Sequence, residues 1–115
     1  DVYKRQAVNL VNVAKFDGII YSNTTKKRPK PWTFFPENGG LSGKILRDQN
    51  LENIPKIRQW LEKDKVIIGC GGVMVGDDIV KYNKSGADLV QVYSGLVLHP
   101  WKLLTTTKNN RKRIF

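Results

Sequence analysis

The chain has 115 residues, 40% of them hydrophobic, so it is long and apolar enough for the core of one small domain, and wholesale disorder is excluded. One cysteine and one histidine exclude an internal disulfide framework and argue against a zinc site built from protein ligands alone, and no apolar run reaches the roughly 20 residues of a membrane span. The formal net charge of +10, from 20 lysines and arginines against 10 acidic residues, raises the hypothesis of an anionic partner.

Much of the excess positive charge lies in two short clusters. Their basic residues are Lys26, Lys27, Arg28 and Lys30, and Lys108, Arg111, Lys112 and Arg113. Neither cluster is interleaved with aromatic residues, as a base-stacking platform would be. We therefore interpret both as solvated loop or helix faces and expect no nucleic-acid partner. A small basic nucleic-acid-binding module stays open as an alternative.

The N-terminal part of the chain predicts a helix followed by a strand. Residues 7–16, AVNLVNVAKF, have the composition of a helix end, and the apolar stretch near 17–22 is typical of a buried parallel strand. Residues 1–6, DVYKRQ, have no place in this pattern. We interpret them as a possible scar outside the domain, which then covers 7–115.

After a long loop, apolar residues at helical spacing predict a helix over 50–63. Asn50 is suited to be its N-cap, because its side chain can accept a hydrogen bond from a free amide of the first turn. Pro55 lies close to this predicted start, where it disturbs the first turns.

The remaining elements alternate between strand and helix. Strands are predicted near 65–70 and 88–93, separated by a helix over 76–85, and a last helix is expected over 100–113. Asp77 and Asp78 fall in the first turn of the 76–85 helix, where the helix dipole favours acidic side chains. Gly86 follows as a C-terminal stop.

This alternation indicates an α/β fold with a parallel sheet. Three strands do not close a barrel, and an open sheet of three strands would expose both of its edges. We therefore expect the chain to be part of a larger fold, the C-terminal strand–helix units of an incomplete (β/α)8 TIM barrel.

Small, polar or glycine-rich residues follow each predicted strand, where parallel α/β folds gather their ligands. Gly71 and Gly72, followed by a helix near residue 76, suit a phosphate held by backbone amides and a helix N-terminus. Asn23 and Thr24 offer the donors and acceptors to bind a planar ligand with ring amides and a carboxylate. The competing interpretation is that Asn23 caps its own loop and Thr24 bonds its own backbone.

Other conspicuous side chains rank lower as functional residues. Cys70 reads as a small strand residue, and His99 as an ordinary loop residue. Trp32, Phe34 and Phe35 read as loop packing, with a lid over a ligand as the alternative.

In combination, the segments DGIIYSNTT, ENGGLSGKILRD, VIIGCGGVMVGDD and SGADLVQVYSGLV resemble the C-terminal part of dihydroorotate dehydrogenase, the flavin enzyme of pyrimidine synthesis. The resemblance runs from about Phe16 to His99, and the order and spacing of the segments make it specific. SNTTKKRP and LVQVYSGLV resemble the membrane-associated, quinone-reducing class, because the soluble class has a glycine where Tyr93 stands.

The resemblance implies a role for each strand-end residue. It implies FMN binding by Ser22, Gly43, Gly71, Gly72, Tyr93 and Ser94, and binding of the dihydroorotate or orotate ring by Asn23 and Thr24. Ser22 stands where the family has a threonine, and Ser94 where a threonine is commoner. The glycines after the second strand would then clear space for the flavin phosphate.

The implied reaction is the oxidation of dihydroorotate to orotate with FMN as cofactor and ubiquinone as electron acceptor. The family's catalytic serine lies upstream of the matching segments, so we assign no catalytic residue here and expect the isolated chain to be inactive. Membrane attachment through an upstream segment is also implied, at the mitochondrial inner membrane or the bacterial cytoplasmic membrane. A phosphate-binding barrel enzyme without flavin remains the enzymatic alternative.

Overall fold

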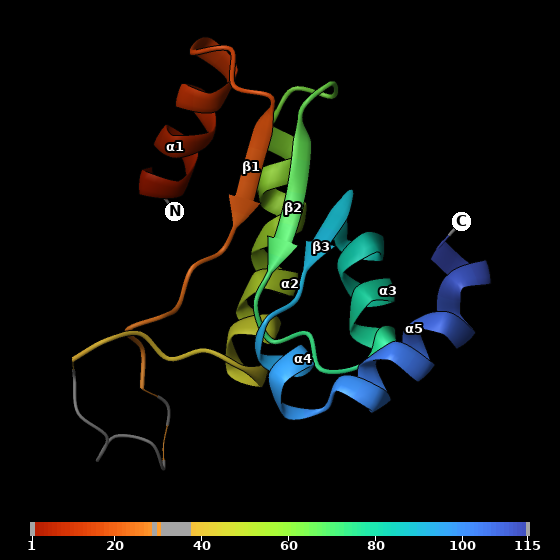
Figure 1. Cartoon of the computed structure of the whole chain (residues 1–115). Coiled ribbons are helices and arrows are strands. Elements are labelled where there is room, and N and C mark those ends of the chain that lie inside the picture. Colours follow the sequence, from red (N-terminus) through yellow and green to blue (C-terminus); the bar gives the residue numbers. More distant parts are fainter. Residues whose placement is uncertain (1, 29, 31–37, 115) are drawn as a thin grey trace.

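The computed structural model describes residues 2–28, 30 and 38–114, with side chains described as far as Thr107. The elements, shown in Figure 1, are α1 (Val2–Val13), β1 (Gly18–Tyr21), α2 (Lys44–Trp60), β2 (Val66–Cys70), α3 (Gly76–Ser85), β3 (Leu89–Gln91), α4 (Ser94–Leu98) and α5 (Pro100–Ile114). None of the helices in this described part is long and apolar enough to cross a membrane.

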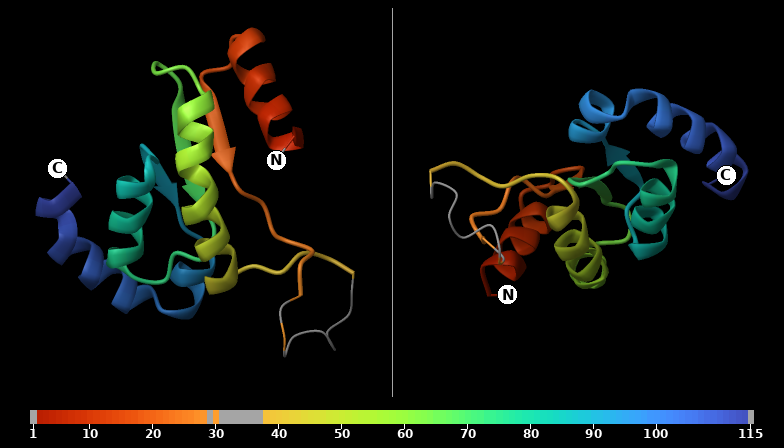
Figure 2. Two further views of the ribbon diagram at one scale, coloured as in Figure 1. Left: turned by 180° about the vertical axis from the view of Figure 1, so that it is seen from behind. Right: turned by 90° about the horizontal axis from the view of Figure 1, so that it is seen from below.

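The three strands form one parallel sheet in the order β1-β2-β3. Helix α2 connects β1 to β2 and α3 connects β2 to β3, so the middle of the chain forms two consecutive β-α-β units, with α1 before them and α4 and α5 after them. Seen from behind, α2 runs along the strands and covers one face of the sheet at β2 (Figure 2). The parallel α/β architecture predicted from the alternating pattern is confirmed.

The core lies between this helix layer and the sheet. Ile67 of β2 is fully buried against Ile54 and Ile57 of α2 and Tyr82 of α3, and Val8 of α1 belongs to the same cluster. Burying each aliphatic side chain of this kind stabilises the fold by about 1.5–3 kcal/mol. The sheet is therefore held mainly through one of its two faces.

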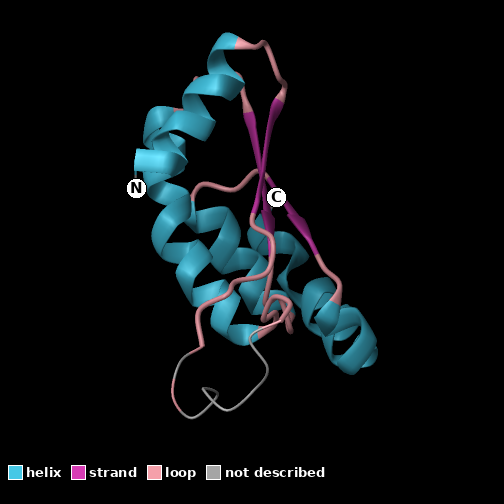
Figure 3. Cartoon of the chain, turned by 90° about the vertical axis from the view of Figure 1, so that its left-hand side faces the viewer, coloured by secondary structure: helices cyan, strands magenta, loops and turns pink. Residues whose placement is uncertain are grey.

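The opposite face of β1 and β2 carries no helix, as the edge-on view in Figure 3 shows. The strand register places Ile20 beside Ile68 and Ile68 beside Leu89, so these three side chains form one row across the sheet. Ile20 is 56% exposed and Leu89 59% exposed. In a closed barrel, rows of aliphatic side chains from neighbouring strands fill the interior. The bare row is therefore what a sector of such a barrel presents.

Helix α2 begins at Lys44, well before the predicted start at Asn50. Its N-cap is Gly43, which has a positive φ of 91° and no side chain that could cap the helix. Asn50 lies inside the helix and is only 1% exposed, so its predicted role as an N-cap is wrong. Pro55 is also well inside the helix.

The two ends of the chain contain more helix than predicted. Val2–Gln6 belong to α1. The expectation that they lie outside the pattern of helices and strands is therefore wrong. The division of the chain into residues 1–6 and a domain over 7–115 stays a prediction. The short helix α4 was not predicted. Gly86 caps α3 in the left-handed conformation with φ 119°, as predicted.

Candidate functional site

The carboxyl ends of all three strands open onto one pocket of about 200 Å³. Every predicted site residue except Gly43 lines it: Ser22, Asn23, Thr24, Gly71, Gly72, Tyr93 and Ser94. The remaining lining residues are Ser42, Leu46, Cys70, Val73 and Gln91. The structure thus brings together residues from three separate strand ends and from the start of α2.

The end of β1 is held by a short series of hydrogen bonds. The Ser22 amide donates to the Cys70 carbonyl oxygen at 2.9 Å, and Ser22 Oγ donates to Asn50 Oδ1 at 2.7 Å. Asn23 Oδ1 accepts from the Thr24 amide at 2.8 Å. Asn23 therefore caps its own loop, which leaves its amide group fixed at the edge of the pocket.

Gly71 and Gly72 are needed where the loop after β2 meets the first turn of α2. Both have positive φ angles, 128° and 68°. A β-carbon on Gly71 would stand 2.6 Å from Leu46 Cδ2, and one on Gly72 would stand 2.5 Å from the Gly43 carbonyl oxygen. The space that these side chains would occupy is filled by α2 itself, which gives the glycines a packing role in addition to any ligand role.

The start of α3 is closed by acceptors of the protein. Asp78 Oδ2 accepts from the Met74 and Val75 amides at 3.0 and 3.2 Å, and the Gly76 amide donates to Thr106 Oγ1 at 2.6 Å. The amides that would hold an anion at this helix start are therefore occupied. A phosphate at the N-terminus of this helix would have to compete with these acceptors, and the expectation of one there stays a prediction.

Asp78 also has a charged partner. Its Oδ1 accepts from Arg47 Nη1 at 2.7 Å, and Asp78 is 1% exposed. The sequence predicted Asp77 and Asp78 to be equivalent acidic residues at the helix start. The structure adds a second role for Asp78, because its ion pair with Arg47 joins α3 to the first turns of α2.

At the start of α4, the N-cap residue Tyr93 makes no side-chain capping bond. Gly95 lets this start approach the loop after β2, since a β-carbon there would stand 2.1 Å from the Val73 carbonyl oxygen. Ser94 Oγ lies 3.4 Å from Ser42 Oγ. Residues that follow β2 and β3 and the two hydroxyl groups therefore come together at one side of the pocket.

A buried polar network, which the sequence did not predict, lies directly beneath the pocket. Asn50 Nδ2 donates to the Cys70 carbonyl oxygen at 2.7 Å and to Tyr82 Oη at 3.0 Å, and Tyr82 Oη donates to the Gly71 carbonyl oxygen at 2.6 Å. Burial raises the pKa of Tyr82 to about 12, so the phenol is neutral at physiological pH. A β-carbon on Gly69 would stand 2.3 Å from Tyr82 Cδ1, so Gly69 makes room for the ring.

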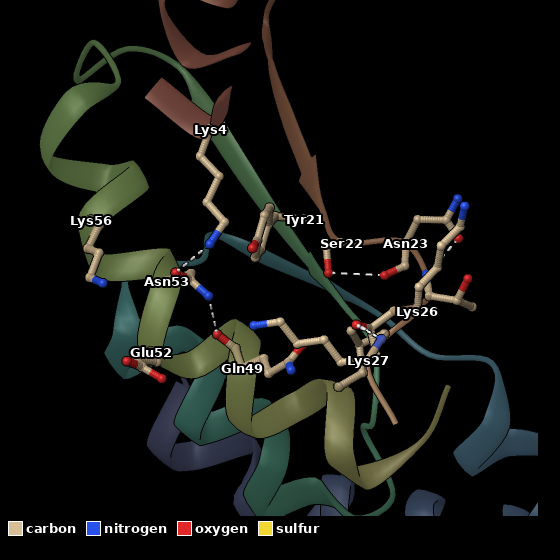
Figure 4. A pocket seen from close by; sticks show the side chains of 13 residues that line it. Lys4, Tyr21, Ser22, Asn23, Lys26, Lys27, Gln49, Glu52, Asn53 and Lys56 are labelled. Atoms are coloured by element: carbon tan, nitrogen blue, oxygen red, sulfur yellow. Dashed lines mark hydrogen bonds between the residues drawn. The ribbon is translucent and has the colours of Figure 1, made fainter. Parts of the chain in front are cut away.

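A second pocket, of about 560 Å³, lies between α1, the end of β1 and α2 (Figure 4). It shares Ser22, Asn23 and Thr24 with the first pocket. Its charged lining residues are Lys4, Lys26, Lys27, Glu52 and Lys56. This hollow is therefore basic, and Lys26 and Lys27 of the first basic cluster border it while remaining exposed to solvent.

The other members of the basic clusters behave differently. Arg28 donates to the backbone carbonyl oxygens of Thr25 and Gly39, at 3.1 and 2.9 Å, and so fixes the loop. The side chains of the C-terminal basic cluster lie outside the described residues. The same holds for the loop residues Trp32, Phe34 and Phe35. Cys70 is half-buried in the wall of the first pocket, and His99 is exposed. Within the described ranges, no three histidine, cysteine, aspartate or glutamate side chains gather as a metal site would require.

Comparison with known proteins gives one family. The family model described as dihydroorotate dehydrogenase matches residues 1–112. The mitochondrial dihydroorotate dehydrogenase (quinone) of Schizosaccharomyces pombe is 38% identical over 102 residues, which cover 84% of this chain and 23% of that relative. The dihydroorotate dehydrogenase (quinone) of Dichelobacter nodosus is 40% identical over 101 residues, covering 86% of this chain and 30% of the relative.

Solved structures show the same relationship. The ligand-free dihydroorotate dehydrogenase of Eimeria tenella superposes with a TM-score of 0.82 at 25% sequence identity, covering 98% of this chain and 33% of that one. The fold is thus similar to part of the barrel of that enzyme. The chain spans about a quarter of the length of the curated relatives that it matches.

Proposed function

The chain belongs to the dihydroorotate dehydrogenase family, and from this premise we propose that it forms the FMN- and orotate-binding end of the barrel in a quinone-dependent dihydroorotate dehydrogenase, the parent enzyme. The parent enzyme would oxidise dihydroorotate to orotate in pyrimidine synthesis. The observation that carries the proposal is the single pocket that collects Ser22, Asn23, Thr24, Gly72 and Ser94 from three strand ends.

The residues present fit the phosphate of FMN. The N-cap residue of α4, Tyr93, makes no side-chain capping bond, and α4 lies against the loop after β2, whose residues Gly72 and Val73 line the pocket. Ser42 and Ser94 add two hydroxyl groups on the same side. Backbone amides and hydroxyl groups are the donors that bind phosphate in proteins of this architecture. When bound, FMN supplies the two-electron redox chemistry, and the protein supplies position and polarity.

We place the substrate ring against the end of β1. The amide of Asn23 and the hydroxyl of Thr24 are suited to a planar ring that carries both amide donors and carbonyl acceptors. The bond from the Thr24 amide to Asn23 Oδ1 fixes the orientation of that side-chain amide before a ligand arrives. Ser42 and Ser94 are assigned to binding, and the proton-abstracting base is not assigned to any residue of this chain.

The electron acceptor and the location are part of the same proposal. The relatives are named as quinone enzymes, and those of Schizosaccharomyces pombe and Oryza sativa also as mitochondrial. A quinone is held in a lipid bilayer, so we propose that the parent enzyme works at a membrane, mitochondrial in a eukaryote and cytoplasmic in a bacterium.

The test uses the parent enzyme with residues numbered as here. Ser94→Asp places a carboxylate beside the proposed phosphate site, and Ser94→Asn is its neutral, nearly isosteric control. We expect Ser94→Asp to lose bound FMN while Ser94→Asn retains it, because like charges repel in a partly desolvated site. Asn23→Ala should keep FMN and raise the KM for dihydroorotate at least about tenfold, with Asn83→Ala on the exposed face of α3 unchanged.

Two results would overturn the proposal. If the parent enzyme is purified without flavin and binds a phosphorylated sugar, it is a phosphate-binding barrel enzyme without FMN. If instead it binds an oligonucleotide with a steep dependence on salt, the basic surface is a nucleic-acid interface.

A further inference from the structure

We propose that Asn50 is a positioning residue that couples the substrate-binding end of β1 to the flavin-binding loop after β2, an inference that rests on the proposed function. Asn50 does not line the pocket itself and lies beneath it, 1% exposed. It acts through the two chain segments that it joins.

The side-chain amide of Asn50 reaches both segments with opposite ends. Its Oδ1 accepts from Ser22 Oγ at 2.7 Å, and its Nδ2 donates to the Cys70 carbonyl oxygen at 2.7 Å. Only this orientation is compatible with both contacts, because a rotated amide would set Oδ1 against the carbonyl oxygen of Cys70. The same carbonyl oxygen also accepts from the Ser22 amide, at 2.9 Å. The ends of β1 and β2 are therefore tied at one point.

Tyr82 extends the connection to the glycine loop. Its hydroxyl accepts from Asn50 Nδ2 at 3.0 Å and donates to the Gly71 carbonyl oxygen at 2.6 Å. The ring is fully buried and occupies the space that Gly69 leaves open. Since both groups lie in the core, a broken link leaves a buried polar atom without a partner, which makes the arrangement stiff.

The connected residues stand directly next to the proposed ligand contacts. Ser22 precedes Asn23, which is assigned to the substrate ring, and Gly71 precedes Gly72, which is assigned to the flavin phosphate. A shift at either end is passed on through Asn50, because its two polar ends are held by different segments. The consequence is that one buried amide controls the affinity for both ligands.

The decisive comparison is between Asn50→Leu and Ile54→Ala in the parent enzyme. Both side chains come from the buried face of α2, but Ile54 makes only apolar contacts in the core. We expect Asn50→Leu to raise both the KM for dihydroorotate and the Kd for FMN about tenfold, the factor that corresponds to one lost buried hydrogen bond. Ile54→Ala should lower Tm at least as much as Asn50→Leu does, and it should leave the KM for dihydroorotate and the Kd for FMN unchanged. Asn83→Leu on the exposed face of α3 is the matched control for the substitution itself.

Tyr82→Phe tests the connection without touching the pocket, because Tyr82 does not line it. We expect it to raise the KM for dihydroorotate in the wild-type background and to have no further effect in the Asn50→Leu background. The inference is overturned if Tyr82→Phe raises the KM equally in the wild-type and Asn50→Leu backgrounds. It is also overturned if Asn50→Leu and Ile54→Ala, at similar losses of Tm, change the KM for dihydroorotate and the Kd for FMN to the same extent. Asn50 would then be a structural residue only. A colourless wild-type parent enzyme would instead overturn the proposed function, and this inference with it.

Discussion

Gly72 lies directly against Arg47: a β-carbon on Gly72 would stand 2.6 Å from Arg47 Cβ and 2.9 Å from the Arg47 amide nitrogen. The loop after β2 and the first turn of α2 are thus packed backbone to backbone. Arg47 then extends to Asp78 at the start of α3, so three elements meet at this contact. The pocket wall is therefore a rigid junction and not a free loop.

We expect Gly72→Ala to lower the free energy of unfolding by about 3 kcal/mol, from left-handed strain of about 1–2 kcal/mol and overpacking of about 1–3 kcal/mol. Gly39→Ala is the matched control, because Gly39 also has a positive φ, 86°, but a β-carbon there would meet nothing within 4 Å. It should lose only the strain contribution. Denaturant unfolding of the two variants measures the difference, and equal losses would contradict the close contact.

Removal of the Asp78 carboxylate should destabilise the protein strongly. Asp78→Ala leaves Arg47 Nη1 and the amides of Met74 and Val75 without their acceptor in a buried position. Breaking a buried pair in this way costs about 3–5 kcal/mol. Asp77→Ala, on the exposed side of the same turn, should cost less than about 1 kcal/mol. Thermal unfolding of both variants provides the measurement, and similar Tm values would show that the Arg47–Asp78 pair contributes little.

Gly69 and Tyr82 should behave as a coupled pair. Gly69→Ala places a methyl group 2.3 Å from Tyr82 Cδ1, which we expect to cost about 1–3 kcal/mol. In the Tyr82→Leu background the ring is absent, so the same substitution should cost much less. A double-mutant cycle from denaturant unfolding measures this coupling. Additive effects would mean that the loop moves away from the ring at little cost.

The raised pKa of Tyr82 predicts how stability depends on alkaline pH. Below pH 10 the phenol is neutral in both the folded and unfolded states. Between pH 10.0, the ordinary value, and about pH 12, the unfolded chain loses this proton while the folded protein keeps it. The free energy of unfolding therefore falls as pH rises through this window. The measurement is the difference in unfolding free energy between wild type and Tyr82→Phe, which should shrink from pH 10 to 12, and a constant difference would contradict the burial of the phenol.

Local patterns in the sequence were sufficient for much of the fold. The strand stretches, the helix after the second strand and its glycine stop at Gly86 depend on residues that are close in the sequence, and the structure has them in place. The start of α2 could not be predicted in this way. Asparagine is a residue type favoured at N-caps, which is why Asn50 was the predicted start. The helix begins at Lys44 instead, because Gly43 adopts a positive φ and Gly72 leaves room for the first turn. Long-range packing therefore decided where this helix starts.

The candidate site shows the same division. The rule that parallel strands gather ligands at their carboxyl ends was enough to select residues that line one pocket, although their roles in binding stay predictions. The network of Asn50 and Tyr82 could not be found, because 32 positions separate the two residues and neither type is unusual in a helix. Buried polar contacts of this kind depend on three-dimensional neighbours that no local pattern specifies.

The bare row of Ile20, Ile68 and Leu89 has a practical consequence for handling the chain. An uncovered aliphatic surface beside unpaired strand edges favours self-association, so the isolated chain should precipitate at concentrations where a closed barrel stays in solution. The same surface makes the chain a natural half of a split-protein pair. Co-expressed with the remaining strands of a family barrel, it should be recovered in soluble form, and flavin colour would then report the reassembly.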